Sequence, residues 1–304
     1  MQKFHLSEAL SLQKYLALVK AVETGNLTKA AEQLGYTQSG VSHMIQALET
    51  ELGFPLLVRS RNGVRLTANG EQLYPAIREI ALQHTQIQQI AAEIRGVQTG
   101  VVRIGTFTSV AIHWLPRIMR EFRSRYPKIE LQVHDASYTE VEEWLEDGKV
   151  DCGFTVQTSH REFITLPLKE DRLLAVLPEG HPLCRYQQLP LSELKNETFI
   201  MPAEGAHHDV GQILRHAAIR AQSSFSTASD YAAIAMVKNG LGISILPEMV
   251  LTGYPISGVE TRDLAQHGSR IICIATPPLK YVAPATHRFV THVLQWVSAL
   301  KQNE

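Results

Sequence analysis

The chain is 304 residues long, with 44% hydrophobic residues, 19% charged residues and a formal net charge of −1. This composition is that of a soluble globular protein with ample core, and the length predicts two or three domains. No apolar run is long enough to span a bilayer and none follows a basic amino terminus, so we expect a cytoplasmic protein.

Residues 28–52, TKAAEQLGYTQSGVSHMIQALETEL, have the apolar periodicity of two short helices around a tight turn. Gly35 ends the first helix, and Thr37 is a capping residue for the second. Residues 12–22 supply a third helix to cover the pair. This is the layout of a helix-turn-helix, with an ordinary packed helix pair as the alternative. The side chains expected to reach base edges in the major groove are Gln38, Ser39, Ser42 and His43.

A basic hairpin is predicted directly after the helix pair. Asn62-Gly63 is a strong two-residue turn between short extended runs, and residues 54–70 include no acidic residue. The segment carries three arginines, Arg59, Arg61 and Arg65. We expect a wing that lies against the phosphate backbone, the alternative being a merely solvated surface. The near-neutral total charge does not oppose this, because it sums over domains with different tasks.

Residues 67–95 predict one long helix that begins at Thr67 and tolerates Pro75 near its start. Side chains recur along it with four-three spacing: Leu73, Ile77, Ile80, His84, Ile87, Ala91 and Ile94. Such a heptad seam needs a partner helix and predicts self-association into a homodimer or a homotetramer. The alternative is a helix packed only on its own domain. His84 is expected to set the register of the seam, with a pH switch as the alternative.

From residue 96 onward, predicted strands alternate with helices. Strands at 101–107, 129–137 and 151–156 are separated by helices at 114–126 and 141–149, and a second set of strands and helices follows residues 173–180. Strands separated in this way predict parallel sheets covered on both faces. The fold class is therefore α/β, with two lobes that form a clamshell for a ligand.

The segment LTKAAEQLGYTQSGVSHMIQALETELGFPLLVRSRNGVRLTANGEQL resembles the amino-terminal domain of the LysR-type transcriptional regulators nearly position for position. GVVRIG at 100–105 and NGLGISILPEMVL at 239–251 resemble elements of that family's effector domain, so the resemblance covers essentially the whole chain. One departure is Gly40, where family members often carry alanine, because a glycine inside a helix costs about 1 kcal/mol.

The resemblance implies three parts: a winged helix-turn-helix at 1–66, a linker helix for dimerisation at 67–95, and a periplasmic-binding-protein-like effector domain at 96–304. Its lobe I would comprise about 100–168 and 277–304, and its lobe II about 169–276, with crossovers near 168–178 and 270–277. Such a protein binds operator DNA and responds to a small-molecule effector. The DNA-binding residues implied are Thr28, Thr37, Gln38, Ser39, Ser42, His43, Arg59, Arg61 and Arg65.

The effector site is expected at the carboxyl ends of the strands, where the following helices begin. The loop 106–109 offers three hydroxyls and free N–H groups, which suit an anion, with helix capping as the alternative. Carried over from the family by position, the effector-binding residues are Thr106, Thr108, Ser109, Thr155, Met201 and His207 or His208. The two histidines give only a weak indication of a metal, and we expect no metal and no cofactor.

No motif of the types GxxxxGK, GxGxxG after a first lobe strand, GxSxG or HExxH occurs, so we expect a regulator and no enzyme. Two further hypotheses stay open: a thiol-based redox regulator, and a binding protein or enzyme that shares only the clamshell. Cys152 and Cys273 fall in hydrophobic strands, where thiols are inert. Cys184, beside Arg185, is the candidate for redox sensing.

Overall fold

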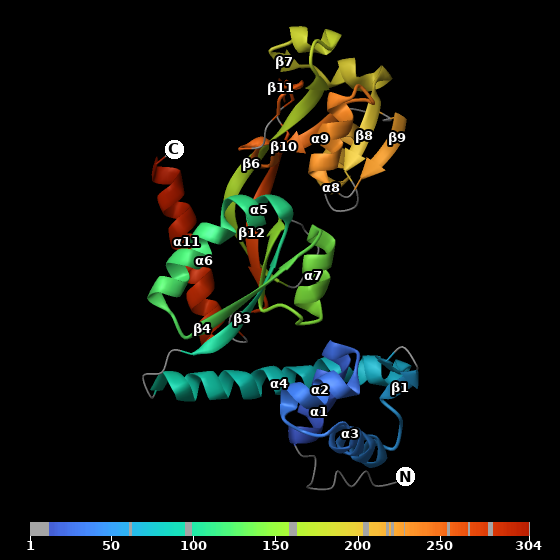
Figure 1. Cartoon of the computed structure of the whole chain (residues 1–304), viewed down its shortest axis with the longest axis vertical. Coiled ribbons are helices and arrows are strands. Elements are labelled where there is room, and N and C mark those ends of the chain that lie inside the picture. Colours follow the sequence, from blue (N-terminus) through green and yellow to red (C-terminus); the bar gives the residue numbers. More distant parts are fainter. Residues whose placement is uncertain are drawn as a thin grey trace. The chain divides into compact units, whose positions relative to one another are not determined.

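The computed structural model describes residues 12–60, 63–94, 99–157, 163–202, 207–216, 219, 222–227, 229–253, 256–266, 268–278 and 282–303. The chain divides into two compact units, Met1–Val97 and Gln98–Glu304 (Figure 1). Each unit is described by itself. None of the described helices is both long enough and apolar enough to cross a membrane.

The first unit contains the predicted helix-turn-helix and wing. Its elements are α1 (Leu12–Thr24), α2 (Leu27–Leu34), α3 (Gln38–Leu52), β1 (Leu57–Ser60), β2 (Gly63–Leu66) and α4 (Ala68–Ile94). The predicted apolar positions point inward: Val41, Ile45 and Leu48 of α3 are completely buried against Leu18 of α1. Gly35 ends α2 with φ of 72°, a left-handed conformation that glycine adopts without strain. The helix-turn-helix prediction is confirmed.

The predicted seam of α4 is divided between two environments. Ile77 is 3% exposed and packs with Leu73 on the core of the helix-turn-helix. Ile80 and Ile87, by contrast, are 42% and 65% exposed, and Ile90 is 42% exposed. The expectation of one continuous seam from Leu73 is therefore wrong, because the first part of that seam is already covered by the helix's own domain.

The first lobe of the second unit is built on a mixed sheet. Its elements are β3 (Gly100–Thr106), α5 (Thr108–His113), α6 (Leu115–Arg125), β4 (Ile129–Asp135), α7 (Tyr138–Glu146), β5 (Cys152–Val156), β12 (Ser269–Thr276) and α11 (Pro284–Asn303). β3 pairs in parallel with β4 and β5, whereas β12 runs antiparallel to β5. Helices α6 and α11 cover one face of this sheet and α7 covers the other (Figure 1).

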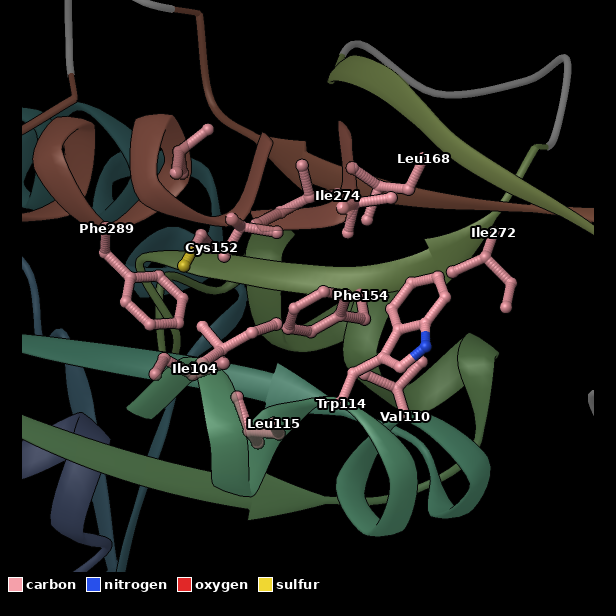
Figure 2. Close-up of a cluster of buried hydrophobic side chains, with 14 of the residues drawn as sticks. Ile104, Val110, Trp114, Leu115, Cys152, Phe154, Leu168, Ile272, Ile274 and Phe289 are labelled. Atoms are coloured by element: carbon pink, nitrogen blue, oxygen red, sulfur yellow. The ribbon is translucent and has the colours of Figure 1, made fainter. Parts of the chain in front are cut away.

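The core of this lobe lies under α5, α6 and α11. Ile104 and Phe154 from the sheet, Ile118 from α6 and Phe289 from α11 are completely buried together. Figure 2 shows this cluster, with Trp114 and Val110 closing it at the end of α5. On the opposite face the sheet carries glycine: a Cβ at Gly105 would lie 2.8 Å from a methyl group of Val141 in α7. Glycine there lets α7 approach the sheet closely.

The second lobe packs around its own strands. Its elements are η1 (Pro182–Arg185), β7 (Gln188–Leu189), η2 (Leu191–Asn196), β8 (Thr198–Pro202), α8 (His207–His216), β9 (Gln222–Thr227), α9 (Asp230–Lys238), β10 (Ser244–Pro247), α10 (Glu248–Leu251) and β11 (Val259–Leu264). β8 and β9 pair in parallel, while β10 and β11 both pair antiparallel with β6 (Ile164–Pro178).

One strand, β6, belongs to the sheets of both lobes. Its residues 164–172 pair with β12 and its residues 173–178 pair with β10 and β11. The α/β class and the two lobes are confirmed, but the expectation of purely parallel sheets is wrong. Antiparallel pairs arise because the chain passes between the lobes twice, through β6 and β12, and returns in the opposite direction.

Candidate DNA-binding face and effector site

The recognition helix α3 begins with a well-formed cap. Thr37 is its N-cap, and its Oγ1 accepts a hydrogen bond from the backbone N–H of Gly40 at 3.1 Å. A Cβ at Gly40 would lie 3.2 Å from that Oγ1, so the alanine common in the family would crowd the cap. Glycine at this position therefore costs helix propensity but leaves room for the capping oxygen.

The side of α3 opposite the core carries the predicted readers. Gln38, Ser39 and His43 are exposed, and Ser42 is half-buried beside them. Thr28 is exposed in the first turn of α2, where its backbone N–H donates to Oδ1 of Asn26 at 2.8 Å. These polar side chains share one surface because the buried positions of α3 fix which way the helix faces.

The wing is fastened to the helix-turn-helix at several points. Oε1 of Glu49 in α3 accepts the backbone N–H groups of Leu56 and Leu57 at 2.7 and 2.9 Å. The N–H of Val64 in β2 donates to the carbonyl of Gly25 at 2.9 Å. Arg59 and Arg65 are both exposed. Arg61 and Asn62 lie outside the described residues.

The predicted effector hydroxyls do not form one open cluster. Thr106 is completely buried at the end of β3, and Ser109 is 2% exposed in the first turn of α5, whereas Thr108 is half-buried. The N-cap of α5 is Phe107, which makes no side-chain capping bond. The alternative of ordinary capping by these hydroxyls is therefore wrong.

The other predicted effector residues are placed on both lobes. Thr155 is 1% exposed, and its hydroxyl donates to Oε1 of Glu142 at 2.9 Å. Met201 is 7% exposed and packs in the core of the second lobe with Phe199. His207 and His208 begin α8, and their side chains are not among those described. Among the described residues, no group of three or more His, Cys, Asp or Glu side chains is arranged to hold a metal ion.

A buried ion pair lies beside Ser109 and was not predicted from the sequence. Nε and Nη2 of Arg270 donate to Oδ2 of Asp171 at 2.9 and 2.6 Å, and the two side chains are 2% and 4% exposed. Nη2 also donates to Oγ of Ser109 at 2.8 Å, and Nη1 donates to the hydroxyl of Tyr138. Oδ1 of Asp171 accepts the backbone N–H of Met249 at 3.0 Å.

This ion pair connects the crossover strands to the beginnings of three helices. Asp171 is in β6 and Arg270 is in β12, while Ser109, Tyr138 and Met249 lie in the first turns of α5, α7 and α10. The ring of Phe107 lies 5.2 Å from the Arg270 guanidinium carbon. The sequence shows Arg270 in an apolar strand and Asp171 just before another apolar strand. Neither signal identifies the partner of the other residue.

Two titratable side chains flank the ion pair. Burial raises the pKa of Asp230, the first residue of α9, and the positive charge of Arg270 partly opposes that rise. Burial lowers the pKa of His113 in α5, against the opposing charge of Asp171. Nε2 of His113 is buried without a hydrogen-bond partner among the described residues. The burial of each group therefore disfavours its charged form.

All three thiols have environments that disfavour the reactive thiolate. Burial raises the pKa of Cys152 well above its usual value, and Figure 2 shows its sulfur inside the core of the first lobe. Burial also raises the pKa of Cys273 to about 11. The pKa of Cys184 is raised by burial and by Glu260. The cation near Cys184 is Arg262, while Arg185 turns to the ring and hydroxyl of Tyr186.

A winged helix-turn-helix joined to a bilobal α/β domain defines a class of DNA-binding regulators with a ligand-binding domain. Residues 12–71 match the family described as "Bacterial regulatory helix-turn-helix protein, lysR family", and residues 95–298 match "LysR substrate binding domain". The chain is 34% identical over 284 residues to the uncharacterised HTH-type transcriptional regulator YvbU of Bacillus subtilis, covering 92% of this chain and 97% of YvbU. The chain therefore belongs to the LysR family of transcriptional regulators, which are not enzymes.

Solved structures agree with the fold. A full-length OxyR from Pseudomonas aeruginosa, in a variant with one cysteine replaced by aspartate, is 21% identical, with a TM-score of 0.79 over 96% of this chain and 95% of that chain. The effector-binding domain of QuiR in complex with shikimate is 20% identical, with a TM-score of 0.61 over 66% of this chain and 98% of that chain. These similarities show the fold and do not transfer a ligand.

Proposed function

We propose that this regulator reads its operator through the exposed start of α3. The observation that carries this proposal is the position of Gln38, Ser39 and His43 on the outward side of a helix whose opposite side is locked into the core. Amide, hydroxyl and imidazole groups can all exchange hydrogen bonds with base edges in the major groove. Thr28 and Thr37, at the beginnings of α2 and α3, would contact the phosphate backbone through their hydroxyl groups. Because it acts on chromosomal DNA, we place the protein in the cytoplasm.

We further propose that α4 makes the contact between copies of the chain. Ile80, Ile87 and Ile90 are exposed apolar side chains on a helix of 27 residues. Self-pairing along this face would bury them and present two recognition helices to two half-sites, as a homodimer or as a homotetramer made of such dimers.

The effector site that we propose lies at the junction of the lobes, around Thr106, Thr108, Ser109 and Thr155, with Met201 and the start of α8 at His207 and His208 on the other lobe. The charge of Arg270 is already compensated by Asp171, and Asp230 adds a further carboxyl group nearby. These described side chains therefore offer no unpaired positive charge to balance a multiply charged anion. We therefore propose an effector with at most one carboxylate, bound through hydroxyl and N–H donors.

Effector binding and DNA binding would be coupled through two arrangements of the oligomer. The effector would shift the population toward the arrangement that binds it more tightly. The raised pKa of Cys152, Cys184 and Cys273 disfavours the reactive thiolate, which supports effector binding over the alternative of redox sensing. We therefore propose that the response depends on binding of a small molecule.

The proposal is tested by selecting DNA with the full-length protein from a duplex library with a randomised central segment. We expect a motif with two related half-sites, and Gln38→Ala should lose about 1–3 kcal/mol of binding to that motif while its binding to random DNA is retained. A metabolite panel is then screened for compounds that raise the melting temperature and change the affinity for the selected duplex. Failure to enrich any motif would show that the chain is not a sequence-specific regulator.

A further inference from the structure

The two described arginines of the wing lie on opposite faces of the hairpin. In the β1–β2 pair, Arg59 is opposite Val64 and Arg65 is opposite Val58. Directly opposed residues project from the same face of a pair of strands, and successive residues alternate between faces. Val64 is buried on the helix-turn-helix, whereas Val58 is 53% exposed. Arg59 therefore lies on the face that turns toward the helices, and Arg65 lies on the face that turns away from them.

A direct contact joins Arg59 to the recognition helix. Its Nη1 donates a hydrogen bond to Oγ of Ser42 at 2.7 Å. Ser42 lies one turn after Gln38 in α3, so the two side chains share one side of that helix. The guanidinium of Arg59 is thereby placed next to the predicted base-reading surface, although the residue belongs to the wing.

The position of Arg59 is fixed before any DNA is bound. Glu49 holds the start of β1, and Gly25 holds β2 through Val64. Glycine at position 63 permits this close approach of β2, because a Cβ there would lie 2.2 Å from the carbonyl oxygen of Gly25. The entropy of ordering the Arg59 side chain is therefore partly lost already on folding, which favours a specific contact over a loose ionic one.

The chemistry of the guanidinium indicates what Arg59 can contact. The bond to Ser42 uses Nη1, and no other hydrogen bond of Arg59 occurs among the described residues. The edge formed by Nε and Nη2 is left to donate two parallel hydrogen bonds. That edge has the geometry to donate to O6 and N7 of guanine in the major groove.

We propose that Arg59 is a specificity-determining residue that reads a guanine next to the bases contacted by α3, with Ser42 as the residue that positions it, whereas Arg65 binds phosphate without regard to sequence. This inference rests on the proposed function, because it requires α3 to lie in the major groove.

The test uses full-length wild type, Arg59→Lys and Arg65→Lys, selected in parallel on the randomised duplex library. Lysine keeps the positive charge but loses the planar fork, so it separates charge from bidentate recognition. Arg59→Lys should reduce the preference for guanine at one position of each half-site by about tenfold or more, with the other positions unchanged. Arg65→Lys, the matched control, should return the wild-type motif.

Two further variants make the outcome decisive. Ser42→Ala should weaken the preference at that same position, and its effect should not add to that of Arg59→Lys, because both remove one arrangement. Arg65→Ala should lower affinity for all sequences equally and reduce the slope of log affinity against log salt by about one. Melting curves check that each variant is folded.

The possible failures are distinguishable. A wild-type protein that enriches no motif would contradict the proposed function. A wild-type motif that persists unchanged in Arg59→Lys, or a loss of affinity that is uniform across sequences, would overturn the inference about Arg59 alone.

Discussion

Asp171 and Arg270 lie on the two strands that connect the lobes, 99 residues apart in sequence, and form an ion pair through two hydrogen bonds of 2.9 and 2.6 Å. Through Ser109, Tyr138 and Met249 the pair reaches the first turns of three helices. Any rearrangement of the lobes that separates β6 from these helices has to break hydrogen bonds to buried charges.

We expect Arg270→Met to lower the free energy of unfolding of the effector domain by about 3–5 kcal/mol, because it leaves Asp171 buried and unpaired. The double variant Asp171→Leu with Arg270→Met should lose much less, since it removes both charges. Arg103→Met is the control: its pair with Asp151 has side chains that are 28% and 18% exposed, so the loss should be about 1 kcal/mol or less. Urea denaturation of the full chain measures all three, and a double variant no better than Arg270→Met would contradict the argument.

The raised pKa of Asp230 predicts a specific dependence of stability on pH. A carboxyl group with a folded-state pKa above its unfolded value stabilises the protein below the unfolded pKa, and this contribution is lost as pH rises through the folded pKa. Asp230→Asn cannot titrate, so its stability relative to wild type should increase as the pH is raised from 4 toward 7. Melting temperatures across that range provide the measurement. The exposed Asp147→Asn serves as control, and a parallel increase there would attribute the effect to net charge instead.

Substitutions on α4 should separate folding from assembly. Ile80→Asp together with Ile87→Asp places charges on exposed positions, so the domain should stay folded while self-association is lost. Ile77→Asp, at a buried position one turn earlier, should instead unfold the helix-turn-helix. Sedimentation velocity at micromolar concentration and circular dichroism distinguish the two results. A double variant that remains fully associated would place the interface elsewhere.

Thr108 and Ser109 are adjacent hydroxyls with different expected roles. Ser109→Ala removes the acceptor of a hydrogen bond from buried Arg270 and should cost about 1–3 kcal/mol of stability. Thr108→Ala, at a half-buried position, should leave stability nearly unchanged and weaken an effector by about 1–2 kcal/mol. Thermal melting measures the first effect, and calorimetry with a metabolite found by the screen measures the second. Equal losses of stability in both variants would refute this division.

The sequence predicted the parts of the fold that depend on local periodicity. The spacing of Val41, Ile45 and Leu48 correctly identified the inward side of α3, because a helix repeats every 3.6 residues wherever it packs. The same logic failed on α4. Spacing shows that an apolar stripe has to be covered, but it does not show that Ile77 is covered by its own domain while Ile87 is exposed.

Features that depend on tertiary contacts were not accessible from the sequence. The first half of β6 was not predicted as a strand, because Pro167 and the four consecutive charged residues 169–172 interrupt the alternation of apolar and polar residues that indicates one. The pairing of Asp171 with Arg270 depends on two strands meeting, and no local pattern encodes it. Ser109 was correctly placed near the start of a helix, but its bond to Arg270 could not be foreseen.

The unbroken course of β6 has a mechanical consequence. A strand of 15 residues that pairs with β12 and then with β10 and β11, with one irregularity in its pairing opposite Ile272 and Cys273, cannot bend like a loop hinge without losing ladder bonds. Relative motion of the lobes has to be accommodated as additional twist around residues 172 and 173, where β6 exchanges one set of neighbours for another. The free-energy cost of rotating one lobe against the other would then grow with the rotation angle. The angle that the lobes reach would therefore depend on how tightly the effector binds.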